Sequence, residues 1–130
     1  MKNARLNNGM TYRCLSDLTG ISLSRLCDIE HGREVPTEYE SGKIKSILGN
    51  DISFATETEA ASNRKELEDC MESISKVYAE LKSRGFGKGN GGSGVMECPK
   101  CGDKLHFSVA SLNGHVWGKC TTKGCLSWMQ

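Results

Sequence analysis

The sequence predicts a mainly α N-terminal domain, a long helix and a small β unit at the C-terminus. Three observations predict this order: short helical segments bounded by capping residues and glycines up to residue 49, an uninterrupted amphipathic stretch at 58–84, and two close cysteine pairs after residue 96. A chain of 130 residues has room for one ordinary domain or for two very small ones, which makes a large active-site cavity unexpected.

The N-terminal segment, residues 1–49, contains good helix start and stop signals. Thr11, Ser22 and Thr37 are N-cap candidates, and Gly20, Gly32 and Gly49 are stop candidates. A helix over residues 11–19, a turn at Gly20 and a helix over residues 22–31 form a predicted helix-turn-helix unit.

The run MTYRCLSDLTGISLSRLCDIEHGREVPTEYESGKIKSILG resembles the DNA-binding domain of Cro and repressor-type (XRE-like) phage regulators, over residues 1–49. The resemblance implies that the helix at 22–31 enters the major groove of DNA. It implies base contacts by Leu23, Ser24 and Asp28. The other DNA-binding candidates at matched positions are Thr11, Tyr12, Arg13, Ser22, Arg25 and Arg33. A helical domain that binds protein instead is the alternative.

Residues 50–84 are interpreted as a connector and an amphipathic helix. Its apolar residues recur at spacings of three and four, which places them on one helical face. They are Leu67, Cys70, Met71, Ile74, Val77, Tyr78 and Leu81. We expect this stripe to join two copies of the chain in a homodimer, and the alternative is that it packs on the chain's own N-terminal domain.

Residues 85–95 hold six glycines in eleven positions, and this composition predicts a flexible linker. The segment 96–130 follows it. Cys98 and Cys101 are separated by eighteen residues from Cys120 and Cys125, which is the spacing of a tetrahedral four-thiolate Zn²⁺ site. Alternating apolar residues at 105–109, a turn at Asn113-Gly114 and a return segment at 115–119 predict a β-hairpin, so this unit is expected to be a small zinc ribbon.

Histidines 106 and 115 are interpreted as solvent-facing or supporting groups, because four cysteines already complete a zinc shell. The segment also resembles the zinc-finger activators of phage late genes, the Ogr/Delta type, in its Cys-Pro-x-Cys opening, its second spacing and its LSWM tail. That resemblance implies action at promoters and contact with RNA polymerase. Trp117 and Trp128 are the predicted partner contacts, to protein or to bases.

The net charge of +1 divides into +1 for residues 1–49, −3 for 50–85 and +3 for 86–130. No apolar run is long enough for a membrane span and the N-terminus lacks a secretory signal, so a cytoplasmic protein is expected, in a bacterium or a phage-infected host. The sequence contains no pair of carboxylates, no Ser/His/Asp set and no phosphate-binding loop that would indicate an enzyme, so an enzyme is not expected.

The sequence therefore predicts a sequence-specific transcriptional regulator of phage or prophage type, which binds double-stranded DNA as a dimer. The zinc ribbon would contact DNA or a protein such as RNA polymerase. Two alternatives remain open: an antitoxin that binds a toxin and regulates its own operon, and a phage protein that inhibits host machinery by binding a host protein.

Overall fold

The structure is a computed structural model that describes residues 1–129, in two compact units divided between Glu66 and Leu67. Helices dominate the first unit, and a small antiparallel sheet with a cysteine cluster lies in the second, which confirms the predicted fold class in this coarse form. Among the described residues, no helix is both long and apolar enough to span a bilayer.

Four short helices and the beginning of a long one build the N-terminal unit. They are α1 (Lys2–Asn7), α2 (Tyr12–Thr19), α3 (Leu23–Glu30), α4 (Glu38–Leu48) and the first part of α5 (Glu57–Ser83). The three predicted N-caps are confirmed, since the side chains of Thr11, Ser22 and Thr37 each accept a hydrogen bond from a backbone N–H three residues on. Gly20 ends α2 in the left-handed conformation, with φ of 74°, and Ser22 then caps α3.

A buried ion pair joins α1 to the end of α3. The guanidinium of Arg5 donates from Nε and Nη2 to the two carboxylate oxygens of Glu30, at 3.0 Å each. It also donates from Nη1 to the carbonyl of Met10 and stacks on the ring of Tyr12, 4.1 Å from the ring centre. The Tyr12 hydroxyl donates to Glu30 as well. No local sequence pattern indicates this network, because its partners lie 25 and 18 residues apart.

Helix α5 begins and ends within one residue of the predicted range. Its first residues belong to the N-terminal unit, where the amide of Asn63 donates to the carbonyl of Gly32 at 2.8 Å and Arg64 donates to the carbonyl of Arg33 at 2.7 Å. From Leu67 onward the helix belongs to the C-terminal unit.

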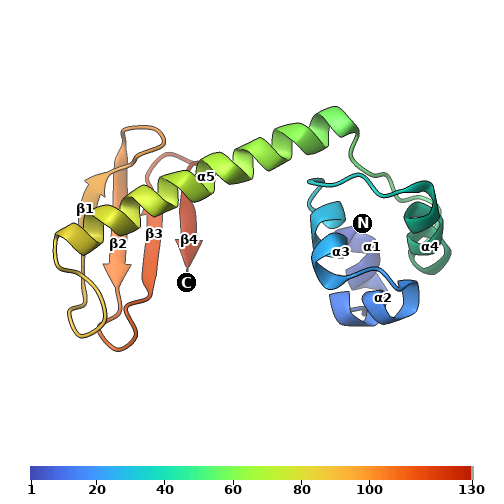
Figure 1. Cartoon of the computed structure of the whole chain (residues 1–130), viewed down its shortest axis with the longest axis horizontal. Coiled ribbons are helices and arrows are strands. Elements are labelled where there is room, and N and C mark those ends of the chain that lie inside the picture. The colour runs from blue at the N-terminus through green and yellow to red at the C-terminus, as the bar shows by residue number, and fades with distance from the viewer. Residues whose placement is uncertain (130) are drawn as a thin grey trace. The chain divides into compact units, whose positions relative to one another are not determined.

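Four antiparallel strands form the C-terminal sheet in the order β1-β2-β3-β4 (Figure 1). Their bounds are β1 (Gly92–Glu97), β2 (Lys104–Val109), β3 (Val116–Cys120) and β4 (Ser127–Met129). The predicted hairpin is β2 and β3, with Leu105, Phe107 and Val109 buried and their neighbours exposed, as the alternation predicted. Strands β1 and β4 were not predicted.

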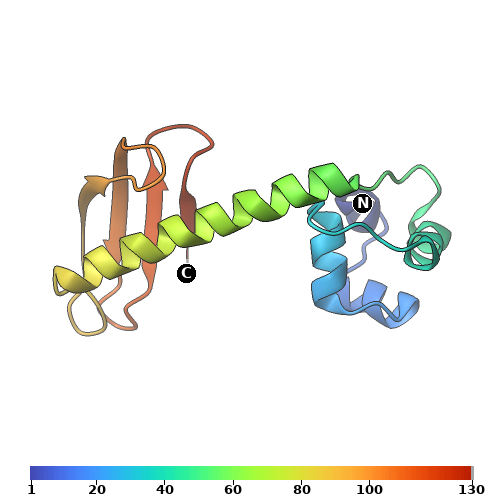
Figure 2. The ribbon, with the colours of Figure 1, turned by 45° about the horizontal axis from the view of Figure 1, so that its top comes forward.

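The second part of α5 covers one face of this sheet, and Figure 1 and Figure 2 show the helix crossing the strands from two directions. Val77 and Leu81 are 0% and 2% exposed in the core that they share with Leu105 and Val116. This corrects their assignment to a dimer interface, since a small sheet buries its apolar face on the nearest amphipathic element of its own chain.

The rest of the predicted dimer stripe divides in two. Cys70, Ile74 and Tyr78 are partly buried against the same core, whereas Leu67 and Met71 are 44% and 57% exposed. The stripe therefore packs on the chain's own sheet, and neither of the two partners predicted for it, a second copy or the N-terminal domain, provides the buried contacts of Val77 and Leu81.

The prediction of a flexible linker at 85–95 is wrong. Residues 92–95 lie in β1, paired with β2 from Gly92 opposite Val109 onward, and Gly87 and Asn90 bridge each other just before it. Other parts of the chain pack too closely on these glycines for a side chain to fit. A Cβ at Gly94 would lie 2.9 Å from the ring of Phe107, and one at Gly91 would lie 2.5 Å from backbone atoms of residues 109 and 111.

Candidate metal centre and DNA-binding surface

Four cysteine thiols meet at one end of the sheet. The Sγ atoms of Cys98, Cys101, Cys120 and Cys125 all lie within 4.8 Å of one another. Two of the separations are 3.8 Å, between Cys98 and Cys125, and 3.5 Å, between Cys101 and Cys120. These are too long for disulfides, and they match the spacing of about 3.8 Å between sulfurs that surround a metal tetrahedrally at about 2.3 Å. The predicted ligand set is thus brought together as a group that can hold a metal ion.

Two backbone turns present these thiols. Cys98 follows β1, and its carbonyl accepts from the N–H of Gly102 at 2.8 Å, which closes the first turn. Gly102 adopts φ of 77°, a conformation that an L side chain rarely takes. Cys120 ends β3, and the N–H of Cys125 donates to the carbonyl of Thr122 at 3.2 Å in the second turn. The ends of the strands therefore fix the ligand positions.

The four thiols are not equivalent. The pKa of Cys101 is lowered to about 6, chiefly because the N–H of Asp103 donates to its sulfur. Burial raises the pKa of Cys125 to about 12 and also raises that of Cys98. Because a metal binds thiolates, binding at this cluster must release protons from the high-pKa cysteines.

Both histidines of the unit lie outside the thiol cluster. His106 and His115 are exposed, and the group of possible metal ligands found in the described residues consists of the four cysteines alone. A closed four-sulfur shell leaves no position for a substrate, which is the arrangement of structural rather than catalytic sites.

The structure changes the expectation for Arg25, a predicted DNA contact. Its guanidinium donates to both carboxylate oxygens of Glu40, at 3.0 Å each, to Glu34 at 3.1 Å and to the carbonyl of Val35 at 3.1 Å. The side chain therefore holds the loop between α3 and α4 onto α3. The assignment of Arg25 to DNA is corrected to this structural role.

Three further DNA-binding candidates are held by other residues. Arg33 donates from Nε to the carboxylate of Asp28 at 2.9 Å, which satisfies charge on both side chains. Tyr12 donates its hydroxyl to Glu30. Burial, together with the hydrogen bond to Glu30, raises the pKa of Tyr12 to about 12. These contacts stabilise the helical unit and occupy polar groups that the predicted DNA contacts would use.

The remaining candidates lie at the beginnings of α2 and α3. Arg13 is exposed and forms no ion pair among the described residues, and Leu23 and Ser24 are exposed in the first turn of α3. Thr11 and Ser22 use their hydroxyl oxygens as helix caps. Arg13, Leu23 and Ser24 are therefore the predicted DNA contacts that remain available.

The pairing of Arg25 with Glu40 gives a prediction about pH. The Arg25 guanidinium, helped by the N–H of Thr37, lowers the pKa of Glu40 from 4.5 to about 2. Because the folded pKa lies below the unfolded value, the stabilisation is complete above pH about 4.5 and is lost as the pH falls toward 2. We expect Arg25→Gln to raise the Glu40 midpoint toward 4.5 in an NMR titration of its carboxyl carbon, whereas Lys43→Gln leaves it unchanged. A wild-type midpoint already near 4.5 would contradict the pairing.

The two tryptophans have different environments. Trp117 is 40% exposed on the sheet face that α5 does not cover, and its contact with a partner stays a prediction. Trp128 packs on the core, and a Cβ at Gly118, its neighbour on β3, would overlap its ring. Its Nε1 is buried without a hydrogen-bond partner. The expectation that Trp128 serves as a partner contact is corrected to packing on the core, because its ring occupies the space that Gly118 leaves and the residue is only partly exposed.

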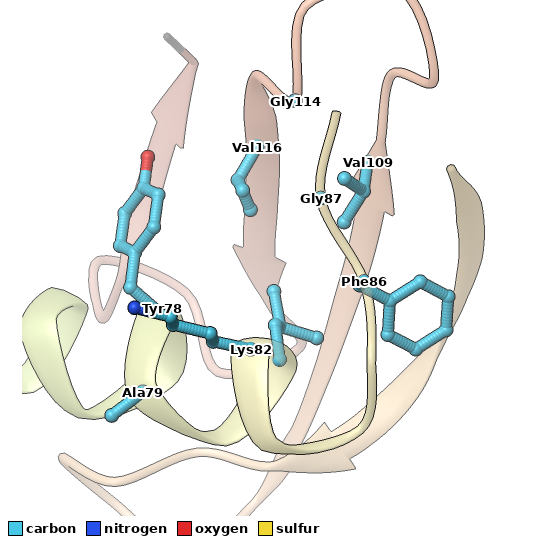
Figure 3. Close-up of a pocket in the computed structure, with 9 residues that line it drawn as sticks. Tyr78, Ala79, Lys82, Phe86, Gly87, Val109, Gly114 and Val116 are labelled. Carbon is cyan, nitrogen blue, oxygen red and sulfur yellow. The ribbon is translucent and has the colours of Figure 1, made fainter. Parts of the chain in front are cut away.

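A hollow of about 360 Å³ opens between α5 and the β2–β3 hairpin (Figure 3). Its walls are apolar, from Leu81, Phe86, Val109 and Val116, with Tyr78 and Lys82 on the helix side. It contains no group of convergent titratable side chains that would indicate catalysis.

Comparisons with family models, with curated proteins and with solved structures found no match to this chain.

Proposed function

We propose that this protein is a DNA-binding transcription regulator of the phage-repressor type, carrying a structural Zn²⁺ site. The observation that carries the proposal is the helix-turn-helix of α2 and α3, whose second helix begins with the exposed side chains Leu23 and Ser24. Helices of this kind contact base edges through their N-terminal residues while the preceding helix crosses the backbone.

The charges that remain unpaired support binding to phosphates. Among the residues described before position 50, four basic side chains form no ion pair, namely Lys2, Arg13, Lys43 and Lys45, whereas only Asp17 and Glu38 are unpaired acids. The other charges neutralise one another within the unit. Arg13, in the first turn of α2, is the proposed phosphate contact.

Leu23 and Ser24 are the proposed base contacts. A leucine can pack on a thymine methyl group, and a serine hydroxyl can donate or accept in the major groove. Neither forms a bidentate pair, so a single unit would discriminate weakly between sequences. We therefore propose that two copies bind two half-sites, joined through surfaces other than Val77 and Leu81; Leu67 and Met71 are exposed and remain candidates for that contact.

The thiol cluster is proposed to bind Zn²⁺ because four cysteines at tetrahedral spacing select a soft, four-coordinate ion. Its role would be to hold the β1–β2 turn and the β3–β4 turn together. The proposed occupant has no open coordination position, which agrees with a regulator rather than a hydrolase.

The proposal is tested by fluorescence anisotropy with the metal-loaded full chain and the duplex directly upstream of its own coding region. We expect binding whose affinity falls steeply with salt, and we expect Arg13→Ala to weaken it several-fold and to reduce the salt slope by about one unit. Ser24→Ala should reduce the preference for this duplex over a scrambled one.

Lys65→Ala is the matched control, since it removes one positive charge from an exposed position of the same unit. It should leave both affinity and slope nearly unchanged. Equal effects of Arg13→Ala and Lys65→Ala, or no binding to duplex DNA at low salt, would overturn the proposed function.

A further inference from the structure

We propose that the sheet face opposite α5 binds single-stranded nucleic acid. This surface, called here the open face, is formed by Val95 of β1, Lys104, His106 and Ser108 of β2, Trp117 and Lys119 of β3, and Ser127 and Met129 of β4. The inference goes beyond the proposed function, because it places a second nucleic-acid site on the other unit of the chain.

The alternation of the strands makes this face open. In β2 and β3 every second residue is buried under α5, and the residues between them point away from the helix and are exposed. Trp117 is 40% exposed and Val95 is 48% exposed. Large apolar side chains on a surface without a covering element indicate a contact site.

The register brings an aromatic ring, cations and hydrogen-bond donors together. Trp117 lies opposite Ser108, and Lys119 lies opposite His106, which in turn lies opposite Val95. Neighbouring strands are about 4.8 Å apart and side chains on one face of a strand are about 7 Å apart. One nucleotide can therefore stack its base on Trp117 while its phosphate reaches Lys119 or His106.

Charge favours a polyanion over an acidic or purely apolar partner. Lys104 and Lys119 lie on the open face, and its one carboxylate, Glu97, lies at the end of β1 with Lys104 as its cross-strand partner. A protein-binding patch of the usual kind would be more continuously apolar, whereas here His106 and Ser108 separate Val95 from the apolar pair that Trp117 forms with Met129. An aromatic side chain beside a cation, as Trp117 is beside Lys119, is instead typical of surfaces that bind unpaired bases without strict sequence preference.

A single strand is favoured over a duplex because stacking on Trp117 requires a base with an accessible face. Bases inside a duplex already stack on one another, and extracting one costs several kcal/mol. A regulator whose helical unit holds duplex DNA would thereby gain a second contact wherever strands separate.

The test uses the metal-loaded full chain with Trp128→Phe, which leaves Trp117 as the one tryptophan and removes an N–H that has no partner. Titration with a twelve-residue oligothymidylate should quench Trp117 fluorescence to saturation. With a labelled oligomer, Trp117→Ala should weaken binding about tenfold, and Trp117→Phe should retain most of the affinity. Lys119→Ser should weaken binding several-fold and reduce the salt slope by about 0.7.

Lys88→Ser is the matched control, because Lys88 is exposed in the turn before β1 and away from the open face. Metal content and near-ultraviolet circular dichroism report whether each variant keeps its fold. Absence of oligomer binding at low salt would overturn the inference and favour a protein partner for this face. Equal loss of oligomer affinity in Trp117→Ala and Lys88→Ser would also overturn it. If Arg13→Ala were the one variant that lost oligomer affinity, the binding would belong to the helical unit, and the inference would be overturned. Loss of duplex binding without loss of oligomer binding would affect only the proposed function.

Discussion

Removal of the metal is expected to unfold the C-terminal sheet. Two of the four clustered cysteines, Cys98 and Cys120, belong to the buried core of the unit, so the proposed metal would hold the same segments as the core. Structural zinc sites supply an apparent 10–16 kcal/mol or so, which equals or exceeds the total stability of about 5–15 kcal/mol of an ordinary domain. Without the ion, β1 and β4 lose the link that holds their ends beside β2 and β3.

The experiment is chelation of the full chain, with released metal measured by a colorimetric indicator. One zinc per chain is expected, together with a red shift of tryptophan emission as Trp128 leaves its site on Gly118. Both tryptophans lie in the C-terminal unit, so this signal reports on that unit alone. Cys98→Ser should give the same emission without chelator.

The cysteines outside the cluster provide the control. Cys14 and Cys27 lie on α2 and α3 of the other unit, and substitution of either by serine should leave one metal per chain. A metal-free chain that keeps the emission maximum and the near-ultraviolet spectrum of the loaded protein would show that the sheet is stable without the ion.

Local signals predicted the helices, the hairpin and the ligand set. An N-cap hydroxyl, a left-handed glycine or an alternating strand depends on residues a few positions apart. Thr11 as a helix cap, Gly20 as a helix end and Phe107 as a buried strand residue therefore have the roles that the sequence predicted. Likewise, the spacing of the four cysteines in the sequence was enough to predict that they form one group. Features of this kind need no knowledge of the tertiary arrangement.

The errors have a common cause, which is that the partner of a residue lies far away in the sequence. A glycine-rich segment loses much entropy on ordering, so residues 85–95 were predicted to be a linker, yet Gly94 makes room there for the ring of Phe107. In the same way, Gly118 makes room for the ring of Trp128, which was predicted to contact a partner. Arg25 resembles a DNA contact until Glu40, fifteen residues later, is placed beside it. The apolar stripe of α5 was predicted correctly, but the sheet that covers it begins only after residue 91.

Loss of the Glu30 carboxylate is expected to have the largest effect in the helical unit. The side chains of Arg5 and Glu30 are only 9% and 1% exposed. Burial by itself would raise the pKa of Glu30, but the hydrogen bonds from Arg5 and Tyr12 outweigh burial and lower it, so the carboxylate is charged in the folded protein. Glu30→Ala would leave the guanidinium of Arg5 buried without a counter-charge, which typically costs about 3–5 kcal/mol.

For a unit of this size, that cost approaches the whole free energy of unfolding. We expect Glu30→Ala to abolish the dispersed amide NMR signals of residues 2–48, while tryptophan emission from the C-terminal unit stays unchanged. Glu38→Ala, at the exposed first turn of α4, is the control and should cost little. In the double variant Arg5→Met with Glu30→Leu, no charge is left unpaired, and recovery of the fold would separate the cost of an isolated charge from any requirement for the ion pair itself. A Glu30→Ala protein with native spectra would mean that water reaches Arg5 and that the pair contributes little to stability.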